Sequence, residues 1–389
     1  MKRRTFLRGS AAGIAIAGAH WLRVPTLVRA DDKPAAAGDS AGQLYELTSR
    51  PANYESTRDT FTTRITPVER FYIRNHFDIP VGDMKDWKLE LKGLVAKPQT
   101  FTLADLEKMK QTTVEAVLQC AGNGRGWFVP RVPGVQWRWG AMGNAEWTGV
   151  RLKDLLAAAG VAKEAQHVQL QGAEKPTLEK TPAFIRGIPI AKAMHPDTLV
   201  ALRMNGQPLS PHHGYPARLV VPGWVGDDWM KWLATIEVRA DEPKGFFYET
   251  GYRFPATPGK PGEPVPPDQM KPMTKLVVKS QLGSIGDGDV IAPGPHELVG
   301  VAFSGEAKIK KVDITVDGGA TWQPAKLDAH DSGYGFRLFR YTWDAKPGKT
   351  KVGARATDSA GAVQPATAVW NPAGYLYNAI EMVEVEVRA

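Results

Sequence analysis

The sequence predicts an α+β region followed by an all-β region with the strand pattern of an immunoglobulin-like β-sandwich. Three observations support this fold class. Between residues 70 and 238, strand-like apolar patterns alternate with short amphipathic helix patterns. A proline-rich stretch then interrupts the chain at residues 254–272. Beyond this stretch, short strand patterns are separated by glycine- and aspartate-rich turns.

In the first region, strands are predicted at residues 87–94 and 167–171, where β-type apolar patterns stand out. Helices are predicted at residues 103–110 and 152–159, where apolar residues recur at helical spacing. The mixture of the two periods indicates an α+β domain, and we place it at residues 70–253.

Prolines dominate residues 254–272, which also contain Gly259 and Gly262. Proline fixes φ and lacks a donor N–H, so this stretch is neither a helix nor a central strand. We predict a stiff, extended linker between the first domain and a second domain at residues 273–389. Strands in the second domain are predicted at residues 276–278, 297–302, 309–316, 335–343 and 350–356.

The chain begins with a predicted twin-arginine export signal at residues 1–30, followed by an N-terminal extension at residues 31–69. Arg3 and Arg4 precede a weakly apolar run, and Val28-Arg29-Ala30 has the small residues of a cleavage site. The apolar run is well short of the roughly 20 residues that a membrane span requires. We therefore expect a periplasmic protein with no membrane span, exported after folding around a cofactor.

The charge of the mature chain argues against a nucleic-acid partner. The formal net charge is +8 over 389 residues, and the export signal carries six of these positive charges with no acid. The mature chain is therefore close to neutral, at about +2. It has no array of basic and aromatic residues typical of nucleic-acid binding.

Cys120 is the only cysteine, and it ends an apolar run that leads into Gly122-Asn123-Gly124 and Arg125. A single thiol excludes an intramolecular disulfide, a CxxC metal clip and a covalent c-type haem. Three roles remain open: an inert buried side chain, a nucleophile, or one thiolate ligand to a metal held mainly by another group. The glycine loop indicates close backbone approach, and the nearby arginine favours the thiolate.

Two further segments gather cationic side chains. Arg74 and His76 are two residues apart, so they share one face of an extended segment. His213 and Arg218 occupy a turn ahead of a tryptophan-rich block that contains Lys231. The adjacent histidines lack a third and fourth ligand at a spacing that suits zinc. We interpret these side chains as a cradle for an anion such as phosphate.

The order and spacing of these motifs resemble the sulfite oxidase family of molybdopterin enzymes, most closely its bacterial periplasmic sulfite dehydrogenases. The resemblance extends from about residue 70 to the C-terminus. It implies a sulfite-oxidase-type molybdopterin domain followed by an immunoglobulin-like dimerisation domain. The motifs that carry it are Tyr72-Ile73-Arg74-Asn75-His76, Cys120-Ala121-Gly122-Asn123, His213-Gly214-Tyr215-Pro216-Ala217-Arg218, Lys231-Trp232, Asp317-Gly318-Gly319-Ala320-Thr321-Trp322 and Trp370-Asn371.

The resemblance also implies roles for individual residues. Cys120 matches the thiolate ligand of molybdenum, whose other sulfur ligands come from the pterin. Glu174 stands near the position of a cofactor-binding aspartate in the family, so this chain offers a longer acid there. Residues implied to hold the molybdopterin and its phosphate are Tyr72, Arg74, Asn75, His76, Glu174, His213, Arg218, Trp229, Met230 and Lys231.

The same resemblance implies a substrate pocket. Three arginines surround the oxyanion in the family, and they match Arg74, Arg125 and Arg337 of this chain. Arginines suit this place because fixed guanidinium groups bind a small dianion well. Trp137 is implied to line this pocket, and Tyr252 matches the family's active-site tyrosine. Since Arg337 belongs to the second domain, we expect this domain to complete the site as well as to form a homodimer.

The implied activity is a molybdenum-dependent sulfite dehydrogenase that converts sulfite to sulfate by oxygen-atom transfer. Too few residues precede the first motif for a cytochrome b5 domain, and the single cysteine allows no covalent haem in this chain. We therefore expect electrons to pass singly to a separate acceptor, a c-type cytochrome.

Other activities fit the same residues. One alternative is the molybdenum subunit of a sulfane dehydrogenase in thiosulfate oxidation. A nitrate reductase is disfavoured because Arg337 matches a sulfite-type contact and because the chain carries an export signal. A non-catalytic binding protein with an immunoglobulin-like module would have a dispensable Cys120 and no molybdenum.

Overall fold

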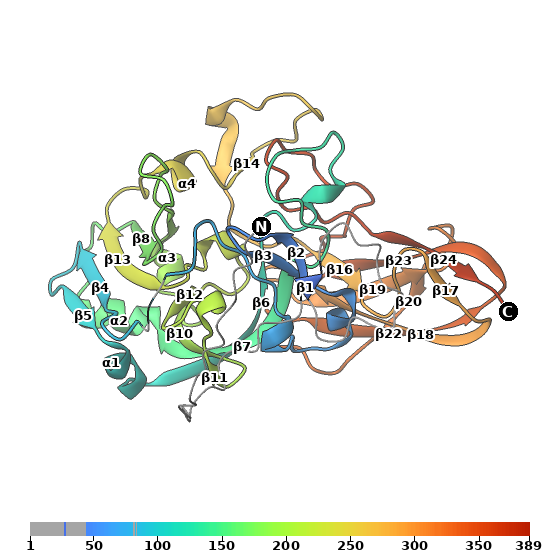
Figure 1. Ribbon diagram of the computed structural model, residues 1–389, viewed down its shortest axis with the longest axis horizontal. Helices are drawn as coiled ribbons and strands as arrows, with labels where there is room; N and C mark the ends of the chain where they lie inside the picture. Colours follow the sequence, from blue (N-terminus) through green and yellow to red (C-terminus); the bar gives the residue numbers. More distant parts are fainter. Residues whose placement is uncertain (1–26, 29–43, 81, 83) are drawn as a thin grey trace, which may run out of the picture.

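A computed structural model describes residues 27–28, 44–80, 82 and 84–389. The predicted export signal and the start of the N-terminal extension lie outside these residues, apart from the two-residue strand β1 (Leu27–Val28). β1 pairs in parallel with β2 (Leu44–Thr48), and β2 pairs antiparallel with β3 (Asn53–Ser56). Figure 1 shows these strands in the middle of the molecule, between two larger regions.

The first region is built around two sheets (Figure 1). One has the order β11-β10-β7-β6, with β12 also paired to β10, and the other has the order β5-β4-β13-β8-β9. The strands predicted at residues 87–94 and 167–171 are present as β4 and β8. The strands are β4 (Leu89–Gly93), β5 (Gln99–Phe101), β6 (Gln111–Gln119), β7 (Met142–Arg151), β8 (His167–Gly172), β9 (Ile185–Pro189), β10 (Leu199–Met204), β11 (Gln207–Pro208), β12 (Arg218–Val220) and β13 (Leu233–Arg239).

Both predicted helices are present. In the first, Thr102 and Asp105 exchange side-chain and backbone hydrogen bonds, a capping box that fixes the start of α1 (Leu103–Lys108). The second, α2 (Leu152–Ala159), ends where Gly160 adopts a φ of +70°. The other helices are α3 (Ile190–Ala193), α4 (Phe246–Glu249) and the 3₁₀ helices η1 (Arg58–Thr62), η2 (Val68–Arg70), η3 (Arg125–Trp127), η4 (Pro211–His213), η5 (Gly226–Asp228) and η6 (Pro267–Gln269).

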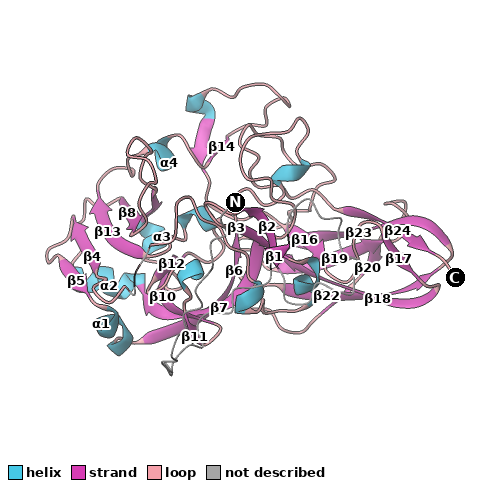
Figure 2. Ribbon diagram, viewed as in Figure 1, coloured by secondary structure: helices cyan, strands magenta, loops and turns pink. Residues whose placement is uncertain are grey.

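The proline-rich stretch folds back on itself. Its two ends pair as antiparallel strands β14 (Arg253–Pro255) and β15 (Met270–Pro272), with Arg253 opposite Pro272. The prediction of an extended linker is therefore wrong in shape, because the segment leaves and returns to the same place. An isolated two-stranded ribbon has free edges, where the missing N–H groups of proline cost no ladder hydrogen bond. Figure 2 shows β14 and its loop at the top of the view.

The second region consists of two sheets that enclose a hydrophobic core. Leu298 and Phe339 from the first sheet contribute to this core together with Val312, Val352 and Val383 from the second. The sheets have the orders β16-β18-β22-β21 and β17-β24-β23-β19-β20. The strands are β16 (Lys279–Leu282), β17 (Asp289–Ile291), β18 (Gly294–Phe303), β19 (Ile309–Thr315), β20 (Gln323–Pro324), β21 (Lys326–Leu327), β22 (Arg337–Ala345), β23 (Gly348–Asp358) and β24 (Met382–Val387).

The second region packs directly on the strand that leads to Cys120. Val299 and Phe303 belong to the hydrophobic core of the first region. The backbone N–H of Val117 in β6 donates to the carbonyl of Tyr334 at 2.9 Å. Both contacts place second-region residues behind the loop that contains Cys120. Within the described ranges, no helix has both the length and the apolar character needed to cross a membrane.

Candidate functional site

Cys120 follows the last residue of β6 and begins a tight loop. Its N–H donates to the carbonyl of Ala141, and its own carbonyl accepts from the N–H of Asn123 at 3.0 Å. A Cβ at Gly122 would lie 2.6 Å from the guanidinium of Arg125, so another residue here would displace that side chain. The thiol is 8% exposed and lies at the edge of a cavity.

The cavity collects all but three of the residues predicted for the site. The second region contributes none of the described lining residues. The predicted residues that line the cavity are Tyr72, Arg74, Asn75, His76, Cys120, Glu174, His213, Arg218, Trp229, Met230, Lys231 and Tyr252. The structure therefore brings the three motifs together, while the role of each residue stays a prediction.

Cationic side chains dominate the polar lining of the cavity. Lys231 donates to the carbonyl of His212 at 3.1 Å and to the side-chain oxygen of Asn75, and burial lowers the pKa of its ammonium well below the usual range. Arg218 donates to the carbonyls of His213 and Trp229 at 3.0 and 3.1 Å, and burial lowers its pKa to about 10. Both shifts arise because a buried positive charge lacks enough opposing charge, which an anionic ligand would supply.

Several buried polar atoms at the cavity have no hydrogen-bond partner within the described part of the chain. They include His212 Nδ1, His213 Nε2, Arg218 Nε and Glu174 Oε2. Buried polar groups are almost always satisfied in a functional protein. Burial raises the pKa of Glu174 to about 7, although Lys231 and Arg74 oppose the shift. These atoms therefore mark the cavity as a place that a polar ligand fills.

Tyr252 is held in an unusual conformation at this cavity. Its φ is +53°, which is rare for a residue other than glycine, and its hydroxyl lies 2.6 Å from His76 Nε2. Burial lowers the pKa of His76 well below its usual value, and the nearby Arg74 adds to this effect. Burial also raises the pKa of Tyr252. The imidazole and the phenol are therefore both neutral, and the hydrogen bond joins two uncharged groups.

Sequence reasoning missed a buried ion cluster beside the cavity. Arg186 Nη2 lies 2.6 Å from Asp227 and 2.8 Å from Asp228, and all three side chains are almost completely buried. Burial raises the pKa of Asp227 well above its usual value, against the opposing charge of Arg186. Asp227 lines the cavity, and its Oδ1 has no hydrogen-bond partner among the described residues. Two acids within an otherwise apolar run were the available sequence signal.

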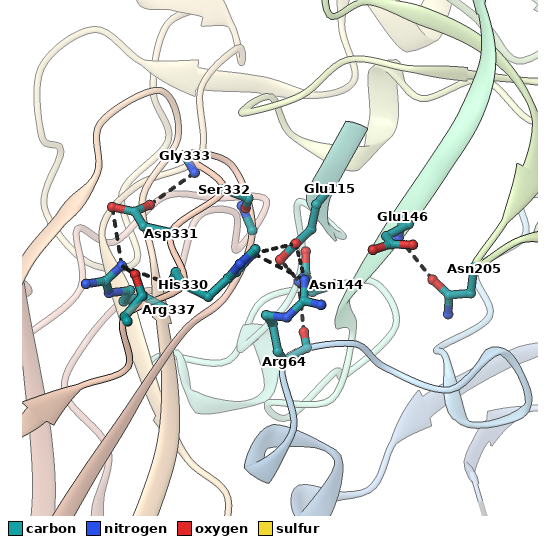
Figure 3. A network of polar contacts seen from close by, with 12 residues as sticks. Arg64, Glu115, Asn144, Glu146, Asn205, His330, Asp331, Ser332, Gly333 and Arg337 are labelled. Atoms are coloured by element: carbon teal, nitrogen blue, oxygen red, sulfur yellow. Dashed lines mark hydrogen bonds and ion pairs between the residues drawn. The ribbon is translucent and has the colours of Figure 1, made fainter. Parts of the chain in front are cut away.

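Arg337 does not line the cavity in the described structure, which corrects its predicted position, while its contact with the substrate stays a prediction. Its Nη1 donates to the carbonyl of His330 at 2.8 Å and lies 3.5 Å from Asp331 (Figure 3). His330 in turn contacts Glu115 at 2.9 Å, which also pairs with Arg64. This network joins the second region to β6, five residues before Cys120, and it occupies the guanidinium of Arg337.

Arg125 and Trp137 also stand outside the cavity lining in the described structure. Arg125 Nε donates to the carbonyl of Ala373 at 2.9 Å, and Nη1 donates to the carbonyl of Val135 at 3.0 Å. Trp137 is fully buried and makes an edge contact with Tyr72. Trp137 therefore supports a residue of the cavity, Arg125 fixes the loop after Cys120, and neither lines the cavity, which corrects their predicted positions.

Comparisons with known proteins agree with this geometry. Residues 76–247 match a family model described as the oxidoreductase molybdopterin binding domain, and residues 271–388 match the Mo-co oxidoreductase dimerisation domain. Sulfite oxidase of Arabidopsis thaliana is 35% identical over 84% of this chain and 89% of its own length. Mitochondrial sulfite oxidase of Homo sapiens is 34% identical over 87% of this chain, which spans 65% of that protein.

Two further relatives widen the range of activities to consider. Nitrate reductase [NAD(P)H] of Hordeum vulgare is 32% identical over 83% of this chain and 39% of its own length. Among solved structures, the sulfane dehydrogenase SoxCD from Paracoccus pantotrophus superposes with a TM-score of 0.77. It is 27% identical, and the match covers 92% of this chain and 96% of that one.

Proposed function

Because this chain belongs to the sulfite oxidase family of molybdopterin oxidoreductases, we propose that it is a sulfite dehydrogenase that passes electrons to a separate acceptor. One observation carries the proposal: a buried cavity places a single thiol, Cys120, beside a concentration of cationic side chains. This arrangement suits a metal bound through one protein sulfur and a cofactor that carries phosphate.

The donor set at the cavity fits molybdenum-molybdopterin. Arg218 Nε, His213 Nε2 and His212 Nδ1 are buried polar atoms without partners in the described residues, and they can bind the pterin and its phosphate. Lys231 supplies further positive charge from the same wall. Cys120 would hold the metal as a thiolate. When bound, the cofactor supplies the two-electron and oxygen-transfer chemistry.

The cavity residues would orient sulfite and exclude bulk water. Arg74 lines the cavity, and a guanidinium provides a planar fork for an oxyanion. Tyr252 also offers its hydroxyl at the cavity, and the hydrogen bond to His76 fixes the position of this hydroxyl. The overall reaction converts sulfite and water to sulfate, two protons and two electrons. In this proposal the electrons leave one at a time to a separate acceptor.

A sulfane dehydrogenase is the second candidate. The SoxCD relative supports it, because the superposition covers nearly all of both chains. One argument against a nitrate reductase was a substrate contact of Arg337, and this argument is weakened because Arg337 does not line the cavity in the described structure. The higher identity to two sulfite oxidases still favours sulfite.

We further propose that the enzyme acts in the periplasm as a homodimer and that a c-type cytochrome accepts its electrons. The paired arginines at residues 3 and 4 support export, and they lie outside the described residues. The match of residues 271–388 to a dimerisation domain supports the homodimer. The immunoglobulin-like topology of this domain also stays a proposal, supported by its two sheets around one core.

Steady-state assays of the purified enzyme separate these activities. Reduction of ferricyanide or cytochrome c is measured with sulfite, thiosulfate or a carrier-bound sulfane as donor, and nitrate consumption is measured with a reduced dye. We expect sulfite to give the largest kcat/KM. Faster turnover of the sulfane would establish the second candidate, and turnover of nitrate alone would overturn both.

A further inference from the structure

The second region reaches the active site through residues 371–377, which we call the capping segment. Asn371 fixes its turn, because its side chain accepts from the N–H of Tyr375 and donates to the carbonyl of Tyr375, both at 2.9 Å. The N–H of Leu376 then donates to the carbonyl of Ala121 at 2.9 Å. The segment is therefore anchored directly beside Cys120.

Tyr375 is the residue of this segment that contacts the site. Its ring stacks on the ring of Tyr252 with centroids 5.4 Å apart and an angle of 14° between the planes. The second tyrosine thus contacts the side chain of the first.

Arg125 holds the ring of Tyr375 in this stack. Its guanidinium carbon lies 5.2 Å from the centre of the Tyr375 ring, while its Nε donates to the carbonyl of Ala373 in the capping segment. Gly374 is packed against the Arg125 side chain, and a Cβ there would lie 2.8 Å from Arg125 Cγ. These contacts fix the ring of Tyr375 from its own segment and from the Cys120 loop.

Tyr252 needs such support because its backbone is strained. A non-glycine residue at positive φ persists only where surrounding contacts determine it. The hydroxyl of Tyr252 must also stay 2.6 Å from His76 at the cavity. The stack with Tyr375 is suited to hold both features.

We propose that Tyr375 is a positioning residue that acts through Tyr252, so that the second region completes the site with an aromatic ring where an arginine was predicted. This inference rests on the proposed function only in assuming that Tyr252 faces the substrate. Arg125 has the supporting role of holding Tyr375, because two of its nitrogens already donate to carbonyl oxygens.

The first test is the crystal structure of the Tyr375→Leu holoenzyme. Leucine keeps an apolar side chain but removes the ring and the hydroxyl. We expect Tyr252 to leave its positive φ and its hydroxyl to separate from His76 Nε2. A Tyr252 that keeps the wild-type conformation in this variant would overturn the proposal. This result does not depend on turnover, so it stands even if sulfite proves not to be the substrate.

The second test is a double-mutant cycle measured as kcat for the substrate on which the wild-type enzyme is most active. Tyr375→Leu should lower kcat about 10- to 100-fold, as expected when a reacting group is misplaced by about 1 Å. Tyr375→Phe retains the ring and should recover most of this loss. In a Tyr252→Phe background, Tyr375→Leu should cause less than about a twofold further loss, because the group that it positions is already gone.

Tyr377→Leu is the matched control. This tyrosine belongs to the same segment but packs edge-on against Phe128, away from Tyr252. It should keep kcat within about twofold of wild type, as a contact outside the coupled pair should. Equal losses in Tyr375→Leu and Tyr377→Leu would show that the order of the segment matters and not the stack. The proposal would also be overturned if the fold-loss of kcat in the double variant Tyr252→Phe/Tyr375→Leu equalled the product of the losses in the two single variants.

Discussion

Removal of the Arg186 charge should destabilise the first region strongly. Arg186→Met keeps a long apolar side chain but leaves Asp227 and Asp228 buried without their cation. Breaking a buried ion pair by removing one partner typically costs about 3–5 kcal/mol. Since 1 kcal/mol shifts Tm by about 2–4 °C in a domain of this size, we expect Tm to fall by about 10 °C.

The loss should also depend on pH. Burial raises the pKa of Asp228 to about 6 even with Arg186 present, and without the cation both carboxyl pKa values should rise further. An acid with a raised pKa in the folded state binds protons more tightly there than in the unfolded state, so stability falls as pH increases. The difference between wild type and Arg186→Met should therefore be larger at about pH 8 than at about pH 5.

Thermal unfolding followed by circular dichroism at both pH values is the assay, and Arg50→Met is the control. Arg50 pairs with Asp78 at 2.6 Å on the surface, where an ion pair contributes little. Its removal should leave Tm unchanged. The addition of Asp227→Asn and Asp228→Asn to Arg186→Met should restore part of the loss. A Tm decrease in Arg186→Met no larger than in the control would refute this account of the cluster.

Two further predictions follow from the geometry. Arg74→Gln should raise the KM for sulfite at least about tenfold with a smaller change in kcat, because Arg74 lines the cavity. Arg337→Met should leave this KM unchanged, because Arg337 donates to the carbonyl of His330 instead. A raised KM in Arg337→Met would place Arg337 at the substrate. Burial lowers the pKa of Lys279 to about 8, against the charge of Glu381. The folded state therefore loses this proton first, and stability should rise by about 2 kcal/mol between pH 8 and 9.5. Urea unfolding of Lys279→Met should show no such rise in the free energy of unfolding between these pH values. The same rise in this variant as in wild type would show that Lys279 is not its source.

Local patterns carried much of the prediction. The helical spacing of apolar residues predicted both α1 and α2, and the structure contains both helices. The motif residues around Arg74, Cys120 and Lys231 were predicted to converge, and they line one cavity. Short-range signals and an ordered set of motifs were enough for these features.

Long-range contacts were beyond the sequence. Arg186 and Asp228 are 42 residues apart and meet only because β9 and η5 pack together. Tyr375 reaches Tyr252 across the boundary between the two regions, and no periodicity marks either residue as its partner. Arg337 was assigned to the pocket by resemblance, but its strand directs it toward the loop at residues 328–335.

Turnover of sulfite by Cys120→Ser tests the central claim most directly. Cys120 carries the one thiol of the chain, this thiol lines the cavity, and serine preserves its size. We expect a folded protein with the Tm of wild type and at least about a thousandfold lower kcat with ferricyanide, since a lost metal ligand removes the reacting centre. Sulfite oxidation at the wild-type rate in this variant would contradict the assignment of Cys120 and the site built around it.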